Sequence, residues 1–285
     1  MKRDRGWPVR LLGRIPLHAI VVAIALLWMV PTVGLLASSF RPAAQVAVTG
    51  WWTAFQTPFQ FTLDNYQSVL TQNGMARSFV NSLIISVPGT VLPLLVAGLA
   101  AYAFAWMKFP GREVLFTIVV ALLVVPIQTT LIPVLRLLAD AKLVGTFPGI
   151  WLAHTAYGLP LAVYLLRNFF ATLPRELIES AYLDGASHLR VFFRMILPLS
   201  VPAVASLAIF QFLWVWNDLL VALVYLQIPS RAPMTLTINN LVNSFGTEWQ
   251  LLTAAAFVSM ILPLIVFIAL QRYFVEGLVT GSVKG

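Results

Sequence analysis

The 285-residue chain is 60% hydrophobic and only 10% charged, and its mean hydropathy of +0.88 is well above that of an ordinary water-soluble domain. Its net charge is +8, and it contains no cysteine, which excludes disulfides and thiolate metal sites. A period-two alternation is missing, and this argues against an outer-membrane barrel. The composition therefore predicts an all-α, polytopic membrane protein.

Six apolar runs are long enough to cross about 30 Å of hydrocarbon, which takes roughly 20 helical residues. We predict spans near 17–39, 79–107, 114–138, 149–166, 201–226 and 251–274. The first run follows basic residues, as in a signal peptide, but it is too long and lacks a small-residue cleavage site, so we expect a retained anchor. No repeat or linker divides the chain, which predicts a single transmembrane domain over 1–285.

Lys and Arg are unevenly distributed among the segments that connect the spans. With the N-terminus inside, thirteen of the 18 lie on the cytoplasmic side. The five that remain outside are Arg41, Arg77, Arg136, Lys142 and Arg231. Because Lys and Arg concentrate in cytoplasmic loops, we expect a multi-pass membrane protein with both termini in the cytoplasm. The net charge then reflects topology and attraction to lipid head groups, and it gives no case for nucleic acid.

The two long outer segments, 40–78 and 227–250, leave their roles open. The first is rich in aromatic residues, including Trp51, Trp52 and Phe55. Such residues are typical of an interfacial belt at the membrane surface. The same segment could instead receive an outer partner, and the sequence does not decide between the two.

The segment 174–202 is the most informative part of the chain, because it is charged where the rest is apolar and therefore cannot lie in hydrocarbon. A first amphipathic helix is predicted, followed by a turn at Asp184–Gly185, since Gly tolerates the left-handed backbone that ends a helix. Ser187 can cap a second helix. The apolar stripes of the two helices are predicted at Leu177, Ile178, Ala181 and Tyr182, and at Leu189, Phe192, Phe193 and Ile196. Periodicity alone thus predicts a helix pair at the inner membrane face.

Three short motifs in this segment resemble the EAA loop of ABC importer permeases. These are Glu179-Ser180-Ala181, Asp184-Gly185-Ala186 and Leu197-Pro198, and their spacing agrees with the family pattern to within one position. In that family the loop is a coupling helix that docks on a separate cytoplasmic ATPase. The resemblance implies that Glu179 makes polar contact with the ATPase and that Asp184 and Gly185 form the turn. It also implies close approach at Ala181 and Ala186, and Leu189 completes the predicted coupling set.

Two further stretches resemble carbohydrate-importer permeases of the maltose-permease type. They are Gln211–Asp218, with the text QFLWVWND, and the C-terminal QRYFVEGLVTGSVKG. The 227–250 segment is most similar to α-glucoside permeases. The resemblance implies that residues 1–285 form one type-I ABC-transporter permease domain in a bacterial inner membrane. It also implies an oligosaccharide or α-glucoside as cargo, an extracytoplasmic sugar-binding protein, a second permease subunit and cytoplasmic ATPase subunits.

The candidate substrate-path residues are Trp214, Asn217 and Asp218. An intramembrane carboxylate indicates function, although Asp218 could equally cap a break in the helix. Trp214 and Trp216 are two residues apart, so on a straight helix they point in different directions and at most one is expected to line a path.

Other chemistries are disfavoured by what the chain lacks. It has no GxxxxGK[ST] phosphate-binding motif, so ATP is expected on partner subunits, and no cofactor or metal is expected on this chain. His18, His154 and His188 lack metal-ligand spacing and are expected to be structural. An enzyme is therefore not expected. The alternative is a self-contained secondary transporter or channel in which 174–202 is only an interfacial helix pair, and such a protein would transport without an ATPase.

Overall fold

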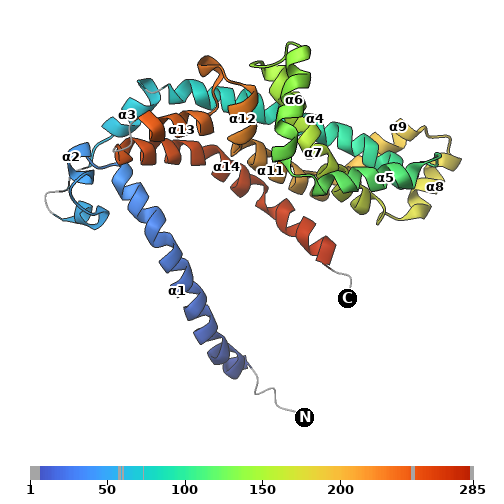
Figure 1. Ribbon diagram of the computed structural model, residues 1–285. Coiled ribbons are helices and arrows are strands. Elements are labelled where there is room, and N and C mark those ends of the chain that lie inside the picture. The colour runs from blue at the N-terminus through green and yellow to red at the C-terminus, as the bar shows by residue number, and fades with distance from the viewer. Residues whose placement is uncertain (1–6, 57–58, 60, 73, 245–247, 283–285) are drawn as a thin grey trace. The chain divides into compact units, whose positions relative to one another are not determined.

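The computed structural model describes residues 7–56, 59, 61–72, 74–244 and 248–282, and the described residues form helices and turns without any strand (Figure 1). The α-helices are α1 Trp7–Ser39, α2 Ala43–Val46, α3 Asp64–Thr71, α4 Met75–Trp106, α5 Arg112–Ala121, α6 Ile127–Asp140, α7 Phe147–Phe170, α8 Arg175–Leu183, α9 His188–Val191, α10 Leu197–Leu199, α11 Val201–Trp216, α12 Leu220–Tyr225, α13 Met234–Ser244 and α14 Trp249–Ser282. Short 3₁₀ turns lie at Trp51–Phe55, Leu122–Val124 and Pro229–Arg231, and a π-helical turn lies at Phe192–Ile196. The all-α prediction is confirmed.

Within the described residues, four helical stretches are long and apolar enough to cross a membrane unaided. They are Pro16–Ser39, Met75–Trp106, Phe147–Phe170 and Trp249–Gln271. Two further candidates are bent helix pairs, and the predicted count of six is reached if each pair is one span. The four straight spans agree with the predicted ones near 17–39, 79–107, 149–166 and 251–274.

The third predicted span, 114–138, corresponds to a bent pair of helices and not to one continuous helix. The structure breaks it near Pro126, and the segments Arg112–Val124 and Ile127–Asp140 meet at 108°. Val125 is extended, with ψ 118°, as the residue before a proline prefers, and Pro126 has no N–H to continue the helical hydrogen bonds. Hydropathy alone does not register such a break, because both sides are apolar.

The fifth predicted span, 201–226, is also divided. Helix α11 ends at Trp216 and α12 begins at Leu220. On its other side α11 is bent by 78° from the segment His188–Leu199. Apolar residues flank positions 217–219, so hydropathy does not show the turn that polar side chains stabilise there.

The chain contacts divide the protein into two compact units. Unit 1 comprises residues 1–73 and 241–258, and unit 2 comprises 74–240 and 259–285. The single-domain assignment of the chain stays a prediction.

In unit 1, the segment that follows α1 is folded back by buried polar groups. The Arg41 side chain is buried, and its guanidinium donates to the carbonyls of Gln45 and Thr49 and to the Thr53 hydroxyl. The Asn65 amide donates to the carbonyls of Ser39 (2.8 Å) and Arg41 (2.9 Å). These bonds hold α3 close to the end of α1, and they satisfy a charge that would otherwise be costly to bury.

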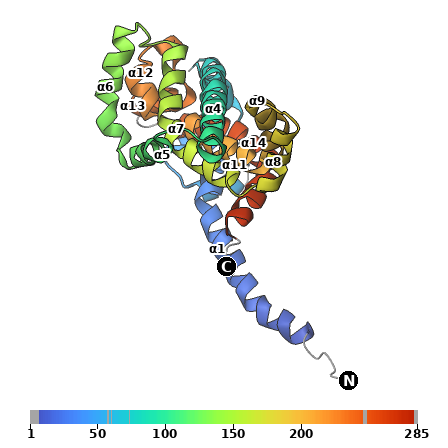
Figure 2. The ribbon, with the colours of Figure 1, turned by 90° about the vertical axis from the view of Figure 1, so that its right-hand side faces the viewer.

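Unit 2 is built on α4 and α7, which pack against each other and lie side by side in both views (Figures 1 and 2). One apolar cluster joins residues early in both helices, including Ile85 and Ile150, and a second joins residues late in both, including Ala101 and Leu166. The two helices therefore run parallel, as expected for two spans that cross in the same direction. The second cluster also contains side chains of α8, α9 and the π-helical turn, so the candidate coupling segment is packed on these two spans.

Candidate coupling loop and permeation residues

The predicted helix pair is present, and its turn has the geometry that requires glycine. α8 ends at Leu183 and Gly185 has a φ of +77°. The Gly185 N–H donates to the Tyr182 carbonyl, and the Ala186 N–H donates to the Ala181 carbonyl, both at 3.0 Å. This is the Schellman arrangement, in which a left-handed residue satisfies the last carbonyls of a helix. A Cβ at Gly185 would meet no atom within 4 Å, so the need for glycine comes from the backbone angle and not from crowding.

Ser187 begins the second helix, as predicted, because its hydroxyl accepts a hydrogen bond from the Arg190 N–H at 3.4 Å. The buried face of the loop consists of Ile178, Val191, Phe192 and Ile196, all at most 4% exposed. They pack with Ala97, Ala101, Leu166 and Phe170 of the spans. The inner face of the loop is therefore part of the same core as α4 and α7.

The predicted apolar stripe of the second helix is wrong in half of its members. Leu189 is 63% exposed and Phe193 is 52% exposed, whereas Phe192 and Ile196 are buried. The π-helical turn at Phe192–Ile196 changes the rotation per residue, so a stripe drawn at i, i+3 and i+4 no longer lies on one face. A Cβ at Gly98 of α4 would lie 3.4 Å from Phe192 Cζ, at ordinary van der Waals contact, so the Phe192 ring packs directly on α4.

The outer face of the loop presents charged residues together with exposed leucines. Glu179, Asp184 and Leu189 of the predicted coupling set are exposed, and Gly185 lies at the exposed turn. Ala181 and Ala186 are half-buried and pack against the shared core. Leu183 is 89% exposed, so the loop offers both apolar and charged contacts to a partner.

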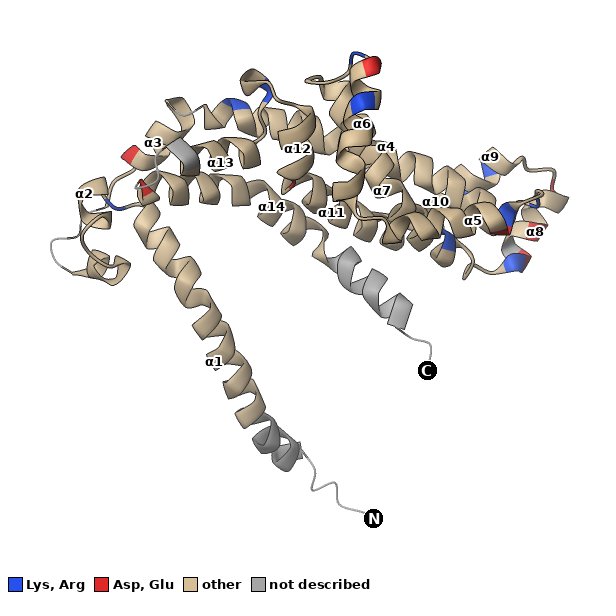
Figure 3. Ribbon diagram, viewed as in Figure 1, with Lys and Arg blue, Asp and Glu red and all other residues tan. Residues whose placement is uncertain are grey.

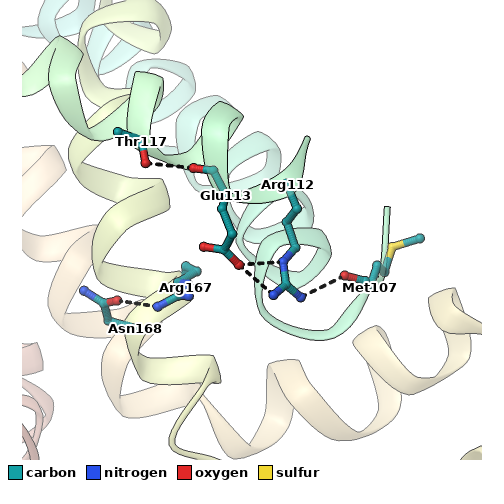
Figure 4. Close-up of polar contacts among 6 residues, drawn as sticks. All are labelled: Met107, Arg112, Glu113, Thr117, Arg167 and Asn168. Carbon is teal, nitrogen blue, oxygen red and sulfur yellow. Dashed lines mark hydrogen bonds and ion pairs between the residues drawn. The ribbon is translucent and has the colours of Figure 1, made fainter. Parts of the chain in front are cut away.

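Other charged residues lie at the same end of unit 2. Figure 3 shows them around α5, α8 and α9. At the start of α5, Arg112 pairs with Glu113 at 2.6 Å and also donates to the Met107 carbonyl, just after α4, at 3.2 Å (Figure 4). Arg167, at the end of α7, lies over the Phe116 ring at 4.7 Å. Met107 and Phe116 pack on the same apolar cluster as the loop, so the turn between α4 and α5 and the coupling loop share one end of the helices.

A set of three side chains that the sequence did not bring together ties the loop to α4. The Tyr102 hydroxyl of α4 lies 2.6 Å from the Tyr182 hydroxyl of α8 and 3.0 Å from Nδ1 of His188 in α9. The Tyr182 hydroxyl lies 2.9 Å from the same Nδ1. We call this set the Tyr–His triangle. Tyr102 is 80 residues from Tyr182, so no local pattern could have indicated the contact.

The second candidate region lies where α11 ends, and here Asp218 caps a helix. Its carboxylate accepts hydrogen bonds from the N–H groups of Val221 and Ala222, each at 3.1 Å. Thr235 donates to the Asp218 carbonyl at 2.7 Å. His154 Nε2 lies 3.9 Å from Asp218 Oδ2, beyond hydrogen-bond distance. The carboxylate thus has partners of its own in the fold, as a cap at a helix break would have.

The two tryptophans of the motif point into different environments. Trp216 is 1% exposed, donates to the Ser259 carbonyl at 3.1 Å and stacks on Phe212. Trp214 is half-buried and lines a hollow of about 260 Å³ between α7 and α11, whose other lining residues include Tyr157 and Gln211. Asn217 is exposed, and its amide donates to the Leu213 carbonyl at 2.8 Å. Of the three candidate path residues, only Trp214 faces this hollow.

The chain is similar to known transport permeases over nearly its whole length. Residues 89–279 match the family described as binding-protein-dependent transport system inner membrane component. The osmoprotective compounds uptake permease protein GgtD of Synechocystis is 59% identical over 95% of this chain and 92% of its own length. The α-glucoside transport system permease protein AglG of Rhizobium meliloti is 43% identical over 94% of this chain and 96% of its own.

Among solved structures, a bacterial ABC transporter involved in the import of the acidic polysaccharide alginate has a similar fold. Its TM-score is 0.75 at 22% identity, and the match covers 96% of this chain and 99% of that one. These matches confirm the resemblance to carbohydrate-importer permeases. The chain therefore belongs to the family of binding-protein-dependent transport system inner membrane components, as an ABC permease and not an enzyme.

Proposed function

We propose that this chain is one of two membrane subunits of a sugar importer and that separate cytoplasmic ATPase subunits dock on α8 and α9. The observation that carries the proposal is the two-sided loop. Its outer face exposes Glu179, Leu183 and Leu189, while its inner face is buried in the core of α4 and α7. A partner that grips the outer face can therefore move the spans.

In this mechanism the chain binds no nucleotide. ATP closes the two ATPase subunits and displaces α8 and α9, and the shared core passes that displacement to the permeation path. The energy enters as a population shift, because ATP must bind the closed arrangement more tightly than the open one. A change from 1:99 to 99:1 between outward and inward openings takes about 5.5 kcal/mol of differential binding.

The proposed orientation places both termini and the coupling loop in the cytoplasm. Within unit 2, the segment that holds Lys108 and Arg112 and the end of α7 that holds Arg167 lie on the same apolar cluster as the coupling loop. Arg231 instead contacts the Gly145 carbonyl near the start of α7. The end that is richer in basic residues is the one expected inside.

The proposed cargo is an α-glucoside or a related oligosaccharide, delivered by an extracytoplasmic binding protein. The relative AglG is named an α-glucoside permease, and the family is defined by dependence on a binding protein. The relative at 59% identity is named for uptake of osmoprotective compounds, which favours a second candidate cargo, a small compatible solute. Trp214 is proposed to line the path, with Asn217 and Asp218 at its edge.

Transport by the reconstituted complex tests this function. The chain would be co-expressed with the proposed ATPase, second permease and binding protein, and the complex would be placed in liposomes. We expect ATP-dependent uptake of at least one of radiolabelled maltose, trehalose and sucrose, and none of the β-linked cellobiose. Uptake of glycine betaine in place of the sugars would favour the second candidate cargo.

The same preparation separates the importer from a self-contained transporter. The importer requires a stable complex with the ATPase and shows no uptake when that subunit is omitted. Transport by this chain alone would contradict the proposal and would support a secondary transporter or channel.

A further inference from the structure

The Tyr–His triangle joins three helices at a position where motion of the coupling loop must enter the spans. Tyr102 belongs to α4, Tyr182 to α8 and His188 to α9. Tyr182 precedes the Asp184–Gly185 turn and His188 follows it, so the contact between them links the two helices on either side of the turn. Both loop helices are thereby attached to a single hydroxyl on one span.

The three residues differ in how deeply they are buried. Tyr102 is only 4% exposed, Tyr182 is half-buried and His188 is exposed. A buried hydroxyl requires a hydrogen-bond partner, and the loop supplies both partners that Tyr102 has in this set. The aromatic rings add edge contacts, at 5.1 Å between Tyr182 and His188 and 5.5 Å between Tyr102 and Phe192.

Apolar packing alone would hold the loop on the spans but would not fix its register. The hydrophobic effect is non-directional, and the side chains that pack here, such as Ile178 and Ile196, meet small residues of α4 such as Ala97 and Ala101. Hydrogen bonds depend steeply on distance and angle. The triangle is therefore the feature that resists sliding or rotation of α8 and α9 against α4.

We propose that the Tyr–His triangle is the joint that couples the loop to the permeation path, with Tyr102, Tyr182 and His188 as positioning residues. This inference rests on the proposed function, since it gives the ATPase-docking loop its mechanical connection. It assigns a role to His188, which the sequence had indicated to be only structural.

The chemistry of the triangle selects the test variants. Removing either the Tyr182 hydroxyl or the His188 Nδ1 leaves one of the three contacts and keeps the buried Tyr102 ring in place. Tyr182→Phe keeps the ring of Tyr182. His188→Gln places its amide near the position of Nε2, so the contact made by Nδ1 is lost. His188→Asn places an amide near the position of Nδ1 and can restore that contact.

The experiment measures ATP hydrolysed per sugar transported, with the complete complex in liposomes, the cognate binding protein, and radiolabelled maltose, trehalose and sucrose as probes. We expect Tyr182→Phe and His188→Gln to keep ATP hydrolysis that the binding protein stimulates but to lower uptake per ATP by about thirtyfold, the scale of two lost hydrogen bonds. His188→Asn should retain the wild-type ratio. Tyr164→Phe is the matched control, since Tyr164 is an exposed residue of α7 that stacks on Phe116.

Two outcomes overturn the inference while the proposed function stands. One is an unchanged ratio in both Tyr182→Phe and His188→Gln. The other is a lower thermal stability of these complexes with the ratio unchanged, which would make the triangle a purely structural contact. If the wild-type complex does not assemble with the ATPase or shows no ATP-dependent uptake, the proposed function itself fails, and this is seen before any variant is measured.

Discussion

The coupling loop of α8 and α9 turns its charged residues outward, whereas the Gln211–Asp218 stretch turns its polar groups onto the protein's own backbone. In the loop, Glu179 and Asp184 are exposed. In the stretch, Gln211 donates to the Gly89 carbonyl at 3.2 Å, and Asp218 accepts from the backbone of α12. A motif can therefore mark a surface meant for a partner or the construction of a helix break, and only the contacts distinguish the two.

The difference extends to what each region can transmit. The inner face of the loop is buried in one apolar cluster with two spans, so we expect a displacement of the loop to move those spans. The stretch is braced on several sides, with Trp216 wedged between Phe79 and Phe212. We interpret the coupling loop as the part that moves when the ATPase subunits close. The Gln211–Asp218 stretch is interpreted as a rigid part of the protein beside the permeation path.

The largest expected effect is a loss of stability, and it comes from Trp216→Ala in the Gln211–Asp218 stretch. Removing a fully buried Trp, together with its bond to the Ser259 carbonyl, should cost about 3–5 kcal/mol and reduce the amount of folded protein in the membrane. Trp214→Ala should fold normally and instead weaken sugar uptake. Thermal unfolding of both purified variants checks this, and equal losses of stability would contradict the different placement of the two rings.

Charge reversal in the loop, Glu179→Lys, should come next. We expect membrane insertion to be intact and ATP-driven uptake to fall by about thirtyfold, as for the loss of an interface hot spot. Asp140→Lys provides the matched control, because Asp140 is an exposed carboxylate at the end of α6, away from the loop. Normal uptake by Glu179→Lys would count strongly against docking at this residue.

The turn itself is tested with Gly185→Ala. At a φ of +77° a Cβ costs about 1–2 kcal/mol, so uptake should decline by about tenfold as the loop loses its geometry. Gly185→Asn should recover much of the activity, because Asn tolerates the left-handed region. Should both variants behave alike, the effect would come from side-chain bulk and not from the backbone angle.

The smallest effect is expected at Asp218. Asp218→Ala removes a helix cap and should lower the free energy of unfolding by about 1 kcal/mol. Asp218→Asn keeps an oxygen that can accept the same bonds and should retain both stability and uptake. Loss of uptake in Asp218→Asn at unchanged stability would show that the charge acts in transport. The Gln211–Asp218 stretch would then have a functional charge, as the coupling loop is proposed to have.

Much of the architecture follows from local sequence, because apolar length, charge and turn residues act within a few positions. The four straight spans, the helix pair and the Gly185 turn are of this kind. Hydropathy did not place the break near Pro126 or the end of α11 at Trp216, because both are flanked by apolar residues. A cap by Asp218 at a helix break was one of the two roles that the sequence left open for this residue, and its carboxylate accepts the hydrogen bonds of such a cap. The exposure of Leu189 and Phe193 was also not predicted. The side of the helix on which they lie depends on a π-helical turn, and a periodicity of 3.6 residues does not describe such a turn.

The Tyr–His triangle could not be predicted for another reason. It needs α4 to lie beside the loop, and that contact spans about a quarter of the chain. Side-chain contacts of this length follow from tertiary packing, while single-sequence periodicity reports only on one element at a time.

The central claim, that the outer face of α8 docks on an ATPase, can be tested directly because the chain contains no cysteine. A single cysteine at Leu183, which is 89% exposed, would carry a photoactivatable crosslinker in the assembled complex, and a single cysteine at exposed Asp140 would serve as the comparison. The account predicts a covalent product with the ATPase subunit from residue 183 and none from residue 140. No product from residue 183, or equal products from both, would contradict it.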